Sequence, residues 1–495
     1  MKRPNVLFVM CDQLRADAIG AYGNSIIHTP NLDRLAKRGV LFTKAYSTCP
    51  VCIPARYTIR TGCEPYNTGF FMNGPPFLEE GQTEKTEERC GRYLARVMSD
   101  MGYRTFGIGK FHTYPDWDEE LGFEVHLHSE ETYSSLEQRE KDAYASFLKN
   151  KHPEFNFIEQ PHGERTEMYY IPQMSPFPAD ITVESWAADR AVEQICMEDE
   201  RPFFGFVSMI GPHPPVAPPI PYNRMYNPDN MPAPVCGDIL VDHMDEQLPW
   251  MNYMIWAEDI GSSVARVIKA RYYGEITYID MCIGRILNAL EQKGYTNNTL
   301  VCFFSDHGDH LGDHHSWQKE SFFEASCRIP FILSWPEFLP KSAVCEDLVC
   351  LTDLFGIATS AAGNPQFRDG IDVLAAVRGC GKKREYLFGY YGVPGTRSFK
   401  IMVRDREWKY IYMANGGREQ LFNLCTDPDE RRQCIETYCA VASRMREVAF
   451  EEARRRPLLS HALCGNSFIA LDYEPLPRVR AYQFDSSRGV YGFMY

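Results

Sequence analysis

Short hydrophobic runs that end in polar residues recur along the chain. Four of them cover residues 5–10, 103–108, 203–210 and 299–304. Uninterrupted apolar runs of this length are typical of strands that are buried on both faces of a parallel sheet. Because ligands bind at the carboxyl ends of such strands, we expect the polar residues that follow the four runs to meet at one site.

Helical patterns separate these runs. The first of them has a proline near its start and a glycine just after its end, which are ordinary helix boundaries. The four helical segments cover residues 29–39, 92–101, 181–197 and 263–293. The alternation of strands and helices predicts a layered α/β domain, in which helices flank a large and mostly parallel central sheet.

Two stretches interrupt this alternation, and the pattern changes after about residue 380. Residues 114–173 are acidic and aromatic, and residues 214–260 are rich in Pro, Met and Tyr; both are typical of insertions that shape a pocket or a subunit contact. Closely spaced short strands beyond residue 380, followed by a helix, indicate an antiparallel sheet. We therefore predict a main domain of residues 1–380, with insertions at 114–173 and 214–260, and a smaller C-terminal α+β subdomain of residues 381–495.

The last residues form an aromatic tail, which predicts packing rather than a free end. A homo-oligomer held together through this tail is one hypothesis. Its aromatic side chains are Tyr482, Phe484, Tyr491, Phe493 and Tyr495.

The composition indicates which classes of binding partner the protein can have. The formal net charge of −14 argues against nucleic acid, although Lys, Arg and a metal can still focus positive potential on an anionic substrate. The apolar runs are too short for a membrane span, and the first of them is too short for a signal peptide. We therefore predict a cytoplasmic protein without membrane contact. The 17 cysteines are scattered, which favours mostly free and buried thiols.

Four residues that follow the first and the last strand-like run are candidate metal ligands. They are Asp12, Gln13, Asp306 and His307. Hard oxygen donors suit Ca²⁺ or Mg²⁺, and a histidine among them also admits Mn²⁺. Each of these residues alone is more simply a strand-end cap. The metal hypothesis therefore depends on the other reactive residues in the sequence.

Residues 52–62 form the motif that supports the metal hypothesis, because they combine Cys52 with Pro54 and Arg56. If Pro54 opens a helix, Cys52 and Arg56 share one face, and the free N–H groups of the helix start point at an anion. A redox couple of Cys49 and Cys52 is the alternative. Further bases and cations follow the other runs, and together they favour acid–base catalysis and charge neutralisation. They are Lys110, His112, His213 and Lys319.

In this order the motifs resemble those of type I, formylglycine-dependent sulfatases within the alkaline phosphatase-like superfamily. The resemblance covers roughly residues 4–430 and rests on six short motifs, at residues 9–13, 52–62, 109–112, 212–214, 305–309 and 317–319. It implies an alkaline phosphatase-like sandwich, with the catalytic domain in residues 1–380. It also implies that a maturation enzyme oxidises Cys52 to formylglycine.

The resemblance implies a role for each candidate. Asp12, Gln13, Asp306, His307 and formylglycine at Cys52 would hold one divalent cation, most often calcium in this family. The reaction would convert a sulfate ester into an alcohol and inorganic sulfate through a sulfo-enzyme intermediate. Arg56 and Lys110 would orient the nucleophile. His213 and Lys319 would stabilise and protonate the departing alcohol, and His112 would take a proton in the final elimination.

Two other functions are alternatives. The Asp-Gln and Asp-His pairings also resemble phosphonate monoester hydrolases and phosphodiesterases, in which Asn73 would be a substrate-contacting residue. Those enzymes tend to carry Tyr and Thr where this chain has Lys110 and His112, so we favour the sulfatase. A non-catalytic or unmatured binding protein on the same scaffold is the third hypothesis. The alcohol of the substrate, whether sugar, aryl, steroid or choline, cannot be read from the sequence.

Overall fold

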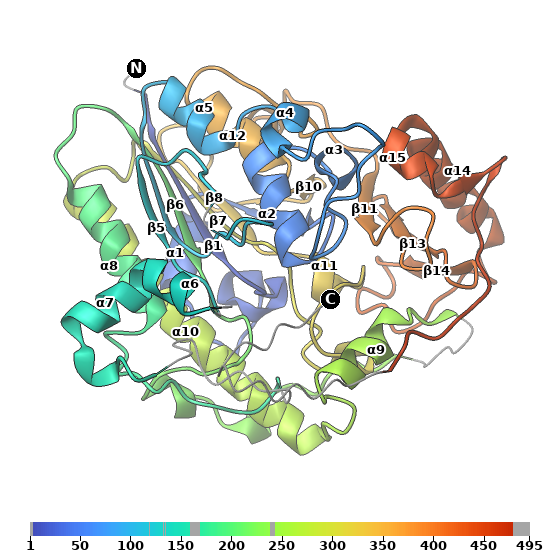
Figure 1. Cartoon of the computed structure of the whole chain (residues 1–495), viewed down its shortest axis with the longest axis horizontal. Coiled ribbons are helices and arrows are strands. Elements are labelled where there is room, and N and C mark those ends of the chain that lie inside the picture. Colours follow the sequence, from blue (N-terminus) through green and yellow to red (C-terminus); the bar gives the residue numbers. More distant parts are fainter. Residues whose placement is uncertain are drawn as a thin grey trace.

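A large mixed sheet runs through the centre of the molecule, with strand order β5-β4-β6-β1-β7-β8-β2-β9 (Figure 1). The computed structural model describes residues 3–117, 119–131, 133, 135–158, 169–237 and 243–478. In sheet order the strands are β5 (Val125–His128), β4 (Arg104–Gly109), β6 (Phe203–Met209), β1 (Asn5–Cys11), β7 (Thr299–Ser305), β8 (Phe331–Ser334), β2 (Val40–Phe42) and β9 (Ala343–Cys345). Within this sheet only β8 opposes its neighbours, so the prediction of a mostly parallel sheet is confirmed.

The four hydrophobic runs of the sequence are the four central strands. Every residue of β1, β4, β6 and β7 is buried, as a strand between two helical layers requires. β1 pairs in parallel with β6 on one side and β7 on the other, and Met10 stands beside both Ser208 and Phe304. The carboxyl ends of the four strands therefore lie along one edge of the sheet, where the predicted site residues follow them.

The two faces of the sheet carry separate hydrophobic cores, because successive residues of a strand point to opposite faces. Leu7, Val9 and Cys11 of β1 belong to one core, whereas Val6 and Phe8 belong to the other. Helices α1 (Pro30–Lys37), α8 (Val183–Cys196) and α10 (Ser262–Gln292) cover the first face, and α2 (Cys52–Thr61), α5 (Leu94–Asp100) and α12 (Asp353–Ala361) cover the second.

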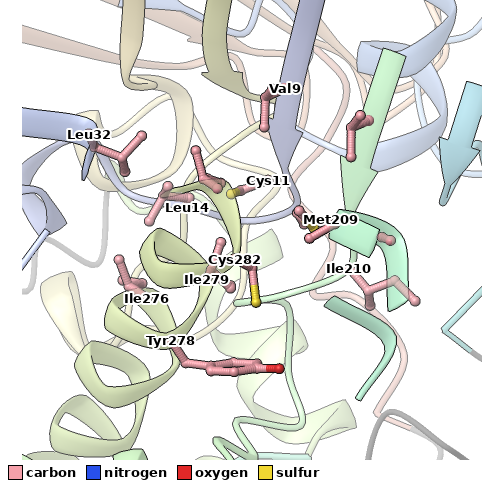
Figure 2. Packing of buried hydrophobic residues seen from close by; sticks show 14 of the residues in the cluster. Val9, Cys11, Leu14, Leu32, Met209, Ile210, Ile276, Tyr278, Ile279 and Cys282 are labelled. Atoms are coloured by element: carbon pink, nitrogen blue, oxygen red, sulfur yellow. The ribbon is translucent and has the colours of Figure 1, made fainter. Parts of the chain in front are cut away.

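All four helices that the sequence predicts are present, and their ends differ only slightly from the predicted ones. Helix α10 is the main helix on the first face of the sheet. Figure 2 shows Ile279 and Cys282 of this helix below Cys11 of β1 and Met209 of β6, with Ile276 on the side of Leu14. Burying side chains of this size contributes about 1.5–3 kcal/mol each. The packing therefore holds the carboxyl ends of β1 and β6 in place.

A second, four-stranded antiparallel sheet follows in the C-terminal part (Figure 1). It consists of β11 (Leu387–Tyr391), β12 (Lys400–Arg404), β13 (Trp408–Met413) and β14 (Arg418–Asn423), and α14 (Cys439–Arg455) packs on it. The antiparallel sheet and its helix are confirmed. The pattern of the sequence did not indicate β14, because its polar and apolar residues do not alternate and only Leu421 and Phe422 are apolar.

The remaining elements are short and connect these layers. They are η1 (Ala16–Ala18), η2 (Gly20–Tyr22), β3 (Ala45–Tyr46), α3 (Pro65–Thr68), α4 (Thr86–Cys90), α6 (Leu136–Lys141), α7 (Ala143–Lys151), η3 (Pro153–Phe155), η4 (Tyr222–Arg224), η5 (Pro228–Asn230), α9 (Gln247–Met254), η7 (Asp313–His315), α11 (Glu324–Cys327), β10 (Val349–Cys350), α13 (Val373–Val377), α15 (Pro457–Ser460), β15 (Leu463–Cys464) and β16 (Ser467–Phe468).

The two predicted insertions contain regular structure. The stretch at 114–173 includes β5, which is the edge strand of the central sheet, so this stretch is partly a sheet element. The stretch at 214–260 contains α9. The aromatic residues of the tail lie outside the described residues, and the oligomer stays a prediction. Within the described part of the chain, every helix is too short or too polar to span a bilayer.

Candidate active site

Helix α2 begins at Cys52 itself, two residues earlier than the position of Pro54 predicts. Val51 is extended, with φ −156° and ψ 150°, and the chain turns into the helix at the next residue. Pro54 lies in the first turn, where its missing N–H costs no hydrogen bond. The side-chain oxygen of Asn73 accepts a hydrogen bond from the Ile53 N–H at 2.9 Å. Asn73 therefore caps the start of α2, and its predicted contact with substrate stays a prediction.

The Cys52 thiol is buried among cations. Its Sγ lies 3.0 Å from Lys319 Nζ, 3.3 Å from His307 Nε2 and 3.9 Å from Asp12 Oδ1, and it also shares a hydrogen bond with His112. Burial by itself raises the pKa of this thiol, but the positive charges of Lys319 and Lys110 outweigh burial and hold the pKa well below its usual range. The environment of position 52 thus favours an anionic group.

Two buried carboxylates face this position. Arg56 bridges them, since its Nη2 lies 2.9 Å from Asp12 Oδ2 and its Nε lies 3.1 Å from Asp306 Oδ2. Burial and the nearby charge of Asp12 raise the pKa of Asp306. Burial also acts to raise the pKa of Asp12, yet the pKa is lowered because the opposing charges of Lys110, His213 and Arg56 prevail. Arg56 therefore organises the carboxylates, rather than bonding directly to Cys52.

The donor set suits a divalent cation. Ligand atoms of Asp12, Cys52, Asp306 and His307 all lie within 4.8 Å of one another. Two carboxylates and one imidazole are ligands that Ca²⁺, Mg²⁺ or Mn²⁺ accept, and a cation would relieve the repulsion between the two carboxylates. These four predicted ligands are thus brought together, and their chemistry fits such an ion.

The fifth predicted ligand, Gln13, lies at the border of this cluster. Its Oε1 accepts a hydrogen bond from Lys319 Nζ at 3.0 Å, and its Nε2 donates to Asp309 Oδ2 at 2.7 Å. Gln13 has a φ of +64°, so its backbone turns sharply after β1 and aims the amide at Lys319. Its role as a metal ligand stays a prediction.

Lys110 and His112 both reach the cluster from the turn that follows β4. Lys110 Nζ lies 2.6 Å from Asp12 Oδ2, and the hydrogen bond of His112 goes to Cys52. His112 has a φ of +49°, which is left-handed backbone. The sharp turn, and not the alternation of a strand, brings both side chains to the same place.

His213 completes the set of predicted bases. It is 2% exposed, and its Nδ1 lies 2.7 Å from the Pro214 carbonyl oxygen and 3.2 Å from Glu131 Oε2. Burial lowers the pKa of His213 to about 4, although Glu131 acts in the opposite direction. The imidazole is therefore neutral at physiological pH unless a further anion binds beside it.

Several residues of the site gave no clear signal in the sequence. Glu130 and Glu131 follow β5, a strand too short and too rich in histidine to stand out. Tyr170 donates a hydrogen bond to Asp309, which in turn accepts one from Gln13. Asp309 stands in a recognised motif, but nothing in the sequence pairs it with Tyr170.

Comparisons with known proteins give relatives that match most of the chain. A sequence model described as Sulfatase matches residues 4–363, and one described as N-sulphoglucosamine sulphohydrolase, C-terminal, matches residues 312–454. An arylsulfatase of Clostridium perfringens is 29% identical over 483 residues, which are 92% of this chain and 95% of that protein. A choline-sulfatase of Rhizobium meliloti is 25% identical over 520 residues, covering 96% and 94% of the two chains.

The solved structures include enzymes that act on a different ester. A phosphonate monoester hydrolase of Agrobacterium radiobacter superposes with a TM-score of 0.76 at 25% identity, covering 92% of this chain and 96% of that one.

Proposed function

Because the chain belongs to the sulfatase family, whose members hydrolyse sulfuric esters, we propose that it cleaves a sulfate ester with formylglycine made from Cys52. The products are an alcohol and inorganic sulfate. The observation that carries the proposal is the position of Cys52, at the start of α2 among Lys319, His307 and Asp12. A nucleophile there faces both a candidate cation site and the positive groups that bind an anion.

The residues around position 52 would have different roles in the reaction. Asp12, Gln13, Asp306 and His307 would hold one divalent ion, most simply calcium, together with position 52. Formylglycine supplies a hydrated aldehyde oxygen as nucleophile, and the cation supplies Lewis acidity. Arg56 keeps the two carboxylates in place through its bonds to both of them.

The remaining bases and cations act on the ester and its products. Lys110 and Lys319 carry the positive charge that neutralises the sulfate group, and both are buried. His213 and Lys319 would give a proton to the departing alcohol oxygen, with the bound sulfate favouring the protonated form of His213. His112, which is hydrogen-bonded to position 52, is the base that removes a proton from it in the final elimination.

Maturation of Cys52 must precede folding. Every residue of α2 is buried, and Cys52 is 1% exposed. An oxidising enzyme could not reach this thiol in the folded protein. A formylglycine-generating enzyme that acts on the unfolded or nascent chain is therefore the partner that we propose.

Phosphonate monoester or phosphodiester hydrolysis is the second candidate, and the similarity to the Agrobacterium enzyme favours it. Both reactions stabilise an anionic tetrahedral centre with in-line attack. The buried Lys110 beside Asp12 favours the sulfate ester, since the family resemblance assigns that reaction to a Lys-x-His pair.

Peptide mass spectrometry across Cys52 tests the proposal, using protein co-expressed with a maturation enzyme. Formylglycine at position 52 is the expected result. A panel of aryl, carbohydrate, steroid and choline sulfates should then be assayed beside a phosphonate monoester. An unmodified thiol in protein that still hydrolyses its substrate would refute the aldehyde mechanism, and a retained thiol without turnover would favour a binding protein.

A further inference from the structure

Two consecutive carboxylates follow strand β5, and they have different surroundings. Glu130 is the inner one. Its Oε1 accepts hydrogen bonds from the backbone N–H groups of Phe111 at 3.2 Å and His112 at 2.7 Å, and it lies 2.6 Å from His128 Nε2. Burial alone would raise the pKa of Glu130, but the hydrogen bond from His128 and nearby positive charges lower it to about 2. Glu130 is thus a fixed anchor of the Lys110–His112 turn.

Glu131 contacts the candidate active site instead. Its Oε2 lies 2.5 Å from Lys110 Nζ and 3.2 Å from His213 Nδ1. Ligand atoms of Asp12, Glu131 and His213 all lie within 4.8 Å of one another. The Glu131 carboxylate therefore stands between two of the groups that the proposed reaction assigns to the sulfate ester.

The two carboxylates that already face Lys110 disfavour the binding of a third anion there. The ammonium group of Lys110 already faces two carboxylates, Asp12 at 2.6 Å and Glu131 at 2.5 Å. A sulfate monoester brings another negative charge to the same ammonium group, and like charges repel strongly in a buried site. Asp12 is fixed by Arg56 and by its role at the candidate cation site, so Glu131 is the carboxylate that can yield.

The hydrogen bonds that hold the chain just before Glu131 do not involve the side chain of Glu131. The residues before it are held, because the Ser129 N–H donates to the Gly109 carbonyl and the Glu130 N–H donates to Asp142 Oδ2. The side chain of Glu131 is 11% exposed, against 6% for Glu130. A rotation of the Glu131 side chain can thus release Lys110 without disturbing the turn that Glu130 anchors.

We propose that Glu131 determines specificity by occupying the place of the substrate sulfate in the resting enzyme, from which the sulfate ester displaces it. This inference rests on the proposed sulfatase function. The carboxylate acts as an internal competitor, so the apparent affinity for an anion is lowered by the fraction of molecules in which Glu131 is bound. Only an anion that binds Lys110 and His213 more tightly than a carboxylate does can displace Glu131 and bind at this site.

Binding of inorganic sulfate to the Cys52→Ala protein, measured by calorimetry with calcium present, tests this inference without turnover. Glu131→Gln keeps the shape of the side chain and removes its charge. If Glu131 is bound in about nine molecules of ten, the variant should bind sulfate about tenfold more tightly. Glu137→Gln is the matched control, because Glu137 makes the same charge change at an exposed site whose partner is Lys141. Its sulfate affinity should equal that of the parent protein.

The matured enzyme provides a second readout. Glu131→Gln should lower the KM for a sulfate ester by a similar factor and change kcat by less than about twofold. Glu131→Ala should behave in the same direction, since it also removes the competing charge. An unchanged or weaker affinity for sulfate in Glu131→Gln would overturn the inference, as would a fall in kcat at constant KM, which is the signature of a residue that only orients His213.

Failure of the proposed function gives a different pattern. If the wild-type protein keeps a thiol at Cys52 and hydrolyses no sulfate ester, the proposed reaction is wrong. The sulfate affinities of Glu131→Gln and Glu137→Gln can still be compared in that case, so the two ideas are tested separately.

Discussion

The ammonium group of Lys319 lies 3.0 Å from the Sγ of Cys52, although 267 positions separate the two residues in the chain. Cys52 begins helix α2, whereas Lys319 belongs to the loop that follows β7 and η7. The same ammonium group lies 3.0 Å from Oε1 of Gln13, beyond the end of β1. Three separate segments thus deliver the nucleophile position and its counter-charge to one point.

Replacement of Cys52 by alanine should abolish sulfate ester turnover without unfolding the protein. The side chain is small and, in the proposed mechanism, becomes the formylglycine nucleophile, so its loss removes the covalent step, and kcat should fall by roughly 10³-fold or more. Activity assays together with thermal unfolding check both parts. Cys49→Ala is the control, because the Cys49 thiol donates to the Phe71 carbonyl and is buried outside the cluster. Near-normal activity in a folded Cys52→Ala protein would contradict the mechanism.

Removal of the divalent cation should lower both activity and stability. Asp12 and Asp306 are fully buried carboxylates at the same site, and a bound cation offsets their repulsion. At a calcium concentration of about 100 times Kd, binding should add about 2.7 kcal/mol to the free energy of unfolding. Thermal unfolding with a chelator, calcium, magnesium and manganese measures this.

The variant Asp306→Asn supplies the control for that experiment. It should lose most of the response to added metal, because one of the two carboxylates is gone. An unfolding temperature that is the same with chelator and with every metal would show that the cluster holds no cation.

Loss of the Glu130 carboxylate should slow catalysis more than it weakens binding. Glu130 accepts hydrogen bonds from the backbone of the turn that carries His112, so Glu130→Ala releases a residue that must sit close to position 52. A displacement of about 1 Å can cost up to about 10² in rate, and we expect kcat to fall by roughly 10- to 100-fold. Steady-state kinetics measure the effect. Glu130→Gln keeps an acceptor oxygen and should lose less; an unchanged kcat in folded Glu130→Ala would disprove the anchoring role.

Glu64 should make the protein less stable as the pH rises from about 5 to 8. Burial raises the pKa of this carboxyl from 4.5 to about 8, although the hydrogen bond from Thr48 acts against the shift. Below pH 4.5 the group is protonated in both states, and its contribution is fully present. At higher pH the unfolded chain ionises first, so stability falls by up to about 1.4 kcal/mol per pH unit until the folded group also ionises.

The variant Glu64→Gln isolates this effect. It keeps an acceptor for Thr48 and cannot ionise, so its free energy of unfolding should vary less with pH, and it should exceed that of the parent most clearly near pH 8. Urea unfolding at several pH values measures the difference. Parallel curves for the two proteins across this range would contradict the raised pKa.

The sequence by itself determined the longer elements and singled out the candidate reactive residues. Strand β7 was expected at residues 299–304, and α10 at 263–293, each within a residue or two of its actual bounds. Such elements follow from local periodicity, because apolar side chains must all reach a core from one strand or one helix face. The order of short motifs likewise singled out Cys52 and several of the residues that surround it.

The tertiary structure alone decided how these residues act on one another. The apolar pattern does not encode strand order, so it could not show that β5 lies beside β4 and brings Glu130 to the backbone of His112 and Glu131 to Lys110. The start of α2 also depends on distant contacts, since its cap comes from Asn73. Local sequence determines which side chains are available, whereas burial and distances of a few ångströms between remote segments determine their charge and partners. Both depend on the packed fold.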